Sequence, residues 1–63
     1  MNQFITVTPI GTNTEIDINV RYIVALINDE DGCSIEIAGS DEYILVKQNK
    51  AKIRKLIAQA RTF

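Results

Sequence analysis

The spacing of hydrophobic residues changes along the chain from the period of a strand to that of a helix. Between residues 14 and 20 every second position is apolar, which is typical of a half-buried strand. Residues 3–8 and 33–37 also alternate and predict two more strands. After Asn49, a good N-cap residue, the apolar residues are three and four positions apart, which predicts an amphipathic helix. The apolar positions of this helix are Ile53, Leu56, Ile57 and Ala60.

Two further segments, residues 22–27 and 43–46, are apolar on both faces and predict strands that need cover on both sides. Turn-forming residues separate the strands, and Gly32 in the acidic turn 28–32 is expected to adopt a positive φ. The resulting order predicts a single α+β domain spanning residues 1–63. We expect an antiparallel β-meander of about five short strands with one C-terminal helix. The sheet either stays open or curls towards a small barrel.

The strands that are apolar on both faces suggest how the protein acts. One helix covers one face of a sheet, so the second face is closed internally or meets another protein. Because small chains often supplement a thin core by oligomerising, we expect a non-enzymatic protein-interaction module that self-associates. The expected interface consists of Tyr22, Val24, Leu26, Tyr43 and Leu45. The alternative face consists of Ile23, Ile27, Ile44 and Val46, and a one-residue shift in register exchanges the two.

Composition excludes several classes of site. The 63 residues include no His, no Trp and one Cys, so an internal disulfide, a typical zinc site and a His-dependent catalytic triad are all excluded. The acidic turn 28–32 lacks the ligand spacing of a calcium loop and is interpreted as a hydrated turn. Cys33 falls on an inward strand position and is expected to pack in the core. We therefore expect no catalytic residue, metal or cofactor.

The same sequence predicts a soluble, cytoplasmic protein. Its longest apolar run, residues 22–27, is far shorter than the roughly 20 residues that span a bilayer. The first residues lack the basic and apolar regions of a signal peptide, and the single Cys suits a reducing compartment. No membrane contact is expected.

Charge is divided unequally along the chain. The net charge is −1, yet residues 1–46 hold eight acids and one Arg, whereas residues 47–63 hold six basic residues and no acid. Either the basic helix complements an acidic sheet within the molecule, or it forms a charged binding face. The second interpretation makes a nucleic-acid-binding accessory protein the alternative function, although the pI of about 5.1 and the absence of aromatic residues among the cations oppose it. The candidate anion or nucleic-acid contacts are Lys47, Lys50, Arg54 and Arg61.

One family shares scattered residues with most of the chain. The shared positions are Ile5-Thr6-Val7-Thr8, Gly11, Ile18-Asn19-Val20, Ile23, Gly39, Tyr43, Val46-Lys47, Ile53 and Ile57. In this pattern the chain resembles the short flagellar-operon proteins of the FlbD-like family. It departs from them in its more acidic turn 28–32 and in Gln48-Asn49, where Glu-Ser is expected. The resemblance implies a non-enzymatic accessory protein and supplies no catalytic residues.

Overall fold

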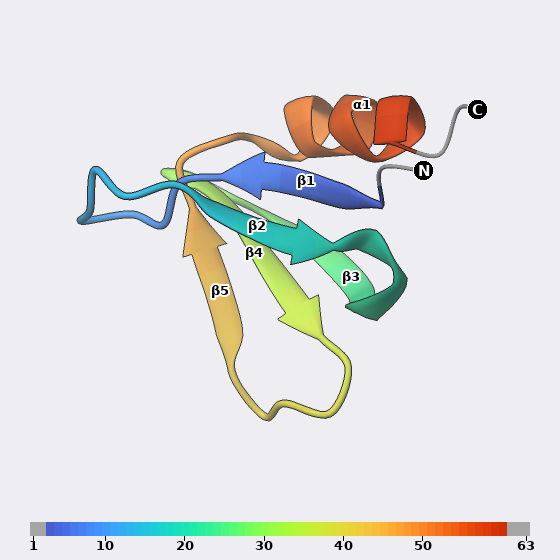
Figure 1. Cartoon of the computed structure of the whole chain (residues 1–63). Coiled ribbons are helices and arrows are strands. Elements are labelled where there is room, and N and C mark those ends of the chain that lie inside the picture. The colour runs from blue at the N-terminus through green and yellow to red at the C-terminus, as the bar shows by residue number, and fades with distance from the viewer. Residues whose placement is uncertain (1–2, 61–63) are drawn as a thin grey trace.

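The computed structural model describes residues 3–60. Its five strands form two antiparallel sheets, and one α-helix packs against a strand of each sheet (Figure 1). The predicted α+β class, with five short strands and a C-terminal helix, is confirmed. A short 3-10 helix separates β2 from β3, so these strands belong to different sheets and the barrel does not close. The elements are β1 (Phe4–Val7), β2 (Ile16–Asn19), η1 (Val20–Tyr22), β3 (Ile23–Asp29), β4 (Gly32–Ile37), β5 (Tyr43–Val46) and α1 (Lys50–Ala60).

The two sheets are β1-β2 and β3-β4-β5, and they meet at one corner. There the chain beyond β1 runs beside the end of β5, with an isolated bridge between Pro9 and Val46. The Lys47 N–H donates to the Thr8 carbonyl at 2.8 Å, and the Ile10 N–H donates to the Leu45 carbonyl at 2.9 Å. This corner fixes the β1-β2 pair over one face of the larger sheet.

The hydrophobic core lies between the two sheets and the helix. The predicted inward positions of the alternating strands are confirmed, because Ile5, Val7 and Ile18 are buried opposite Cys33 and Ile35. Burying one such Ile side chain contributes about 1.5–3 kcal/mol. The buried hydrophobic residues of the described chain are Ile5, Val7, Ile18, Cys33, Ile35, Val46, Ile53 and Ala60.

A β-bulge in β3 changes which residues share a face. Ile23 pairs with Ile37, but Ala25 pairs with the preceding residue of β4, so Val24 is an extra residue. Leu26 consequently lies opposite Ile35 on the inner face and packs against the core. The predicted five-residue face is therefore corrected, since Leu26 does not share a side of the sheet with the other members.

The same shift divides the alternative face. Ile44 pairs with Ile35 and Val46 pairs with Cys33, so both point towards the core. Ile27 instead pairs with Ser34 and is exposed. The alternative face is corrected too, because its members lie on opposite sides of the sheet.

Helix α1 begins where the sequence predicts. The Asn49 side chain accepts a hydrogen bond from the Lys52 N–H at 2.8 Å, which confirms Asn49 as the N-cap. The predicted apolar stripe is confirmed, since it faces the core and places the helix against β1 and β3 (Figure 1). Within residues 3–60 no helix is long and apolar enough to cross a membrane.

Candidate interaction surfaces

The side of the β3-β4-β5 sheet that faces away from the core carries exposed apolar side chains. On neighbouring strands, Ala25, Glu36 and Tyr43 form one row, and Ile27, Ser34 and Leu45 form the next. Val24 is 58% exposed, Ile27 46%, Tyr43 54% and Leu45 36%. We call this surface the outer face and define it by Val24, Ala25, Ile27, Ser34, Glu36, Tyr43 and Leu45.

Two exposed residues border the outer face. Ile10 lies beside Leu45 because its N–H donates to the Leu45 carbonyl. Tyr22 lies next to the end of β4, since its carbonyl accepts from the Ala38 N–H at 2.8 Å. Sequence reasoning missed Ile10 because Pro9 and Gly11 placed it in a turn, and only the pairing of this segment with β5 brings it to the face.

The outer face suits binding rather than chemistry. Strands about 4.8 Å apart with a rise of about 3.3 Å per residue give segments 24–27, 34–36 and 43–45 a combined extent of roughly 160 Å². Its apolar side chains lie on the two outer strands β3 and β5, and the bordering residues Ile10 and Tyr22 extend the apolar surface beyond these segments. Besides the Tyr43 hydroxyl, the polar groups of this face are Ser34 and Glu36, which are half-buried on the central strand β4. The surface can therefore exclude water against a partner, with polar groups along its middle.

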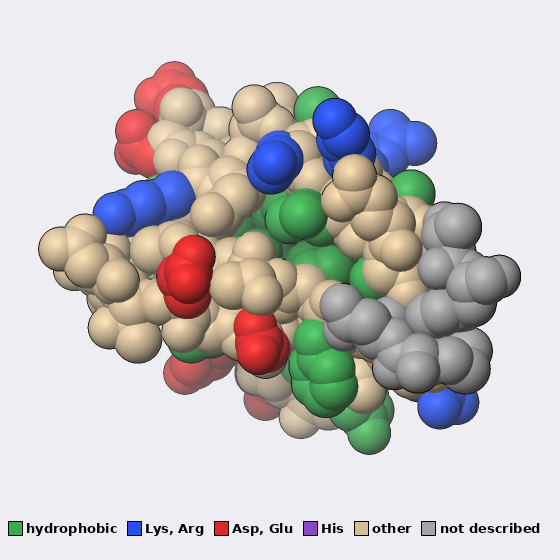
Figure 2. Space-filling view, turned by 45° about the horizontal axis from the view of Figure 1, so that its top comes forward, with side chains coloured by type: hydrophobic (Ala, Val, Ile, Leu, Met, Phe, Trp, Pro, Cys, Tyr) green, Lys and Arg blue, Asp and Glu red, His purple; other side chains and the backbone are tan. Residues whose placement is uncertain are grey.

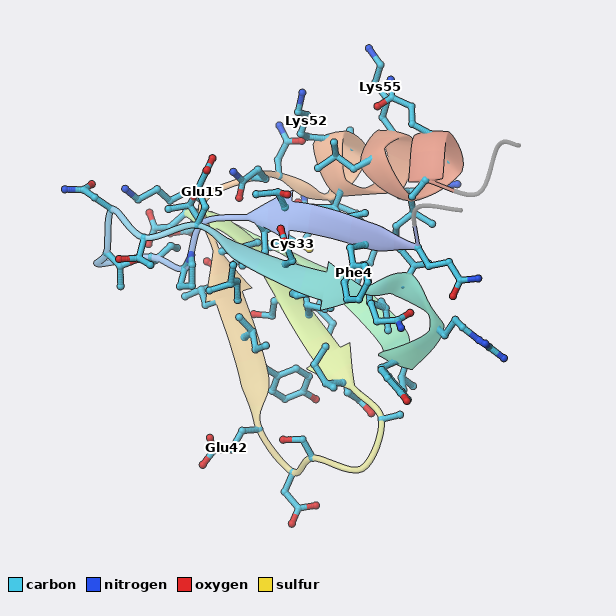
Figure 3. All side chains as sticks on the ribbon, viewed as in Figure 1. Phe4, Glu15, Cys33, Glu42, Lys52 and Lys55 are labelled. Carbon is cyan, nitrogen blue, oxygen red and sulfur yellow. The ribbon has the colours of Figure 1, made fainter. Side chains whose placement is uncertain are left out.

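Cys33 belongs to the core, as predicted. It is fully buried, pairs with Asn28 and Val46 on the two neighbouring strands, and lies between the layers (Figure 3). Burial raises the pKa of its thiol above the ordinary value of 9.0, while a backbone hydrogen bond from Ile27 and the charge of Lys50 act in the opposite direction. The folded state thus favours the neutral thiol.

This pKa shift predicts a loss of stability at high pH. Above about pH 9.0 the unfolded thiol ionises while the folded thiol stays protonated, so stability is fully present below that pH and falls as pH rises. We expect the fall in urea midpoint between pH 7 and pH 10 to be smaller in Cys33→Ala than in the parent protein. An equal fall in both proteins would contradict the assignment to Cys33.

The predicted anion-binding residues do not form one cluster. Lys50 and Arg54 lie on one flank of α1, where they line a shallow recess with Asn28, Asn49 and Ala51. Lys47 instead follows β5 at the corner where the sheets meet. The prediction for Arg61 lies outside the described residues.

Two cations that were not predicted as contacts complete the charged surface of the helix. Lys52 and Lys55 project from α1 away from the sheets, whereas Glu42 lies at the far end of the β4-β5 hairpin (Figure 3). Figure 2 shows Lys and Arg side chains close together at the upper right of the molecule, others at the left and lower right, and acidic side chains at the upper left and below. Within residues 3–60 no ion pair joins a helix cation to a carboxylate.

The residues that carry the resemblance to the FlbD-like family are mostly structural in position. Ile5 and Ile53 are buried in the core, and Gly11 adopts a φ of +86° in the turn after β1. Tyr43, by contrast, is exposed on the outer face. Comparison of the chain with models of protein families, with curated proteins and with solved structures finds no match.

Proposed function

We propose that this protein is a small, non-enzymatic interaction module that self-associates in the cytoplasm through its outer face. The observation that carries the proposal is the exposure of Val24, Ile27, Tyr43 and Leu45 on one side of a sheet whose other side is packed. Exposed aromatic and aliphatic groups on a rigid sheet are typical of protein interfaces. The accessory role implied by the resemblance to the FlbD-like family agrees with this proposal.

A second copy of the chain is the partner we propose. Among residues 3–60 the core contains eight buried hydrophobic residues, and a domain of this size gains stability by covering apolar surface on another copy. A sheet face can meet its own twofold-related copy in a face-to-face packing, with strands aligned within about 30°. Such an isologous dimer covers both outer faces at once and leaves no open-ended contact.

The experiment removes two anchors from the outer face. In Tyr43→Ser/Leu45→Ser the buried apolar area of the dimer falls while the inner face is unchanged. Because central aromatic anchors each contribute about 2 kcal/mol or more, we expect dimer affinity to fall by about 100-fold or more. Size-exclusion chromatography with light scattering, at low and physiological salt, should show a dimer for the parent protein and a monomer for the variant.

Two variants serve as controls for this measurement. Phe4→Ser removes another half-exposed aromatic, from β1 in the opposite layer, and should leave the dimer mass unchanged. Glu36→Gln removes the charge at the middle of the outer face and should strengthen the dimer, since burying an unpaired carboxylate opposes association. A parent protein that is monomeric at millimolar concentration, or equal masses for all variants, would refute self-association through this face.

A further inference from the structure

The outward side of α1 carries two rows of cations separated by small residues. At about 100° per residue, Ala51 and Ala58 lie at the middle of the side opposite the buried stripe. Lys50 and Arg54 flank them on one side, and Lys52 and Lys55 flank them on the other. Ala51, Ala58 and all of these cations except the half-buried Lys50 are exposed. This arrangement, defined here as the cationic ridge, extends the predicted contacts Lys50 and Arg54 by a second row.

The charges of the cationic ridge oppose the stability of the helix that holds them. The first turn of α1 has no acidic residue and contains Lys50 and Lys52, where the helix dipole disfavours cations. Lys50 and Arg54 are four residues apart and Lys52 and Lys55 are three apart, so each pair repels on the helix surface. Since no helix cation of the described chain is in an ion pair, nothing within the molecule offsets this repulsion by direct contact. An anionic partner would offset it.

The chemistry of the ridge distinguishes between anionic partners. Protein interfaces are built on apolar or aromatic anchors and are depleted in Lys, whereas the apolar part of this ridge is two alanines. A polyanion needs only cations and a surface that its backbone can approach, which Ala51 and Ala58 provide. Glu42 lies far from the outward side of the helix (Figure 3), whereas the acidic turn 28–32 begins near the Lys50 and Arg54 row, since Asn28 lines the same recess.

We propose that the cationic ridge binds the phosphate backbone of nucleic acid without sequence specificity. The binding is separate from the proposed self-association, because the ridge and the outer face are different surfaces. Each phosphate neutralised by a Lys or Arg releases about 0.9 counterion, so contacts by four cations give a slope of about −3.6 for log K against log salt. Non-specific binding of this kind has a Kd of about 10⁻⁴–10⁻⁶ M, and the net charge of −1 favours the weaker end of that range.

The experiment measures fluorescence anisotropy of a labelled 20-base-pair DNA duplex as the protein is added at several NaCl concentrations. Removing one phosphate contact lowers the salt slope by about one. We therefore expect Lys55→Gln to lower the slope by about one and Lys52→Gln/Lys55→Gln to lower it by about two. Arg21→Gln is the matched control, since it removes one exposed cation from η1, outside the ridge, and should leave the slope unchanged. Far-UV circular dichroism confirms that each variant is folded.

Each outcome decides for or against the ridge. An absence of binding at low salt and millimolar protein overturns the proposal. If Arg21→Gln and Lys55→Gln lower the salt slope equally, the binding depends on overall charge, and the assignment to the cationic ridge is overturned. Competition by poly-glutamate as strong as that by unlabelled DNA overturns the nucleic-acid assignment in favour of an acidic protein. The monomeric variant Tyr43→Ser/Leu45→Ser should keep the parent salt slope per chain, so failure of self-association is distinguished from failure of this inference.

Discussion

Replacing Gly32 with alanine is expected to leave the domain unfolded at room temperature. Gly32 opens β4 with a φ of +157°, and an added Cβ would overlap the carbonyl oxygen of Val46 and lie 3.0 Å from its carbon. β5 cannot move away freely, because Val46 pairs with Cys33 and the next residue is bonded to Thr8. The cost should exceed about 4 kcal/mol, which is as large as the whole stability of about 3–5 kcal/mol expected for a domain of this size.

The measurement is urea unfolding followed by circular dichroism, with Gly39→Ala as the matched control. Gly39 also has a positive φ, +81°, but an added Cβ there meets no atom within 4 Å. That substitution should therefore cost only the left-handed backbone penalty of about 1–2 kcal/mol. If Gly32→Ala were as stable as Gly39→Ala, the close approach of β4 to the Val46 carbonyl would be refuted.

The positive φ of Gly32 could be predicted, whereas the reason it is indispensable could not. Turn chemistry in residues 28–32 is local, and the structure adds that the Asp29 side chain accepts from the Asp31 N–H at 3.1 Å within this turn. The contact between Gly32 and Val46 depends on the position of β5, because the two residues are 14 positions apart in the chain. Local residue types do not carry that information.

The helix and the alternating strands were predictable because their patterns, like the turn at residues 28–32, are local in sequence. The N-cap at Asn49 and the stripe that begins with Ile53 depend on spacing within one element. Likewise Ile18 and Ile35 are buried on strands whose polar residues mark the opposite face. In such elements the spacing of apolar residues alone indicates which side of the strand or helix faces the core.

The outer face was predicted only in part, because nothing in residues 22–27 marks the bulge. Every residue of that segment is apolar, so the extra residue Val24 shifts the register without any visible break in the pattern. The shift turns Leu26 inward and Ile27 outward. Tyr43 and Leu45 were placed correctly on one exposed side, since β5 pairs with β4 in regular register.

Truncating Ile53 to alanine is expected to destabilise the whole domain by about 3–4 kcal/mol. Ile53 is 0% exposed and belongs to the same buried cluster as residues of β1, β2, β4 and β5. The helix has little stability of its own, because an 11-residue helix is marginal in water and its cations repel one another. Packing of Ile53 therefore holds both the helix and the cationic ridge in place.

Urea unfolding of Ile53→Ala should show a single transition at a lower midpoint, since removing one side of a shared core weakens every layer that it touches. The conservative variant Ile53→Val should cost only about 0.5–1.5 kcal/mol. Leu56→Ala, at a half-buried position of the same stripe, should fall between the two. If Ile53→Ala instead lost helical signal while the tyrosine near-UV signal of the sheet persisted, the helix would be a separately docked unit. The cooperative core inferred from the buried cluster would then be wrong.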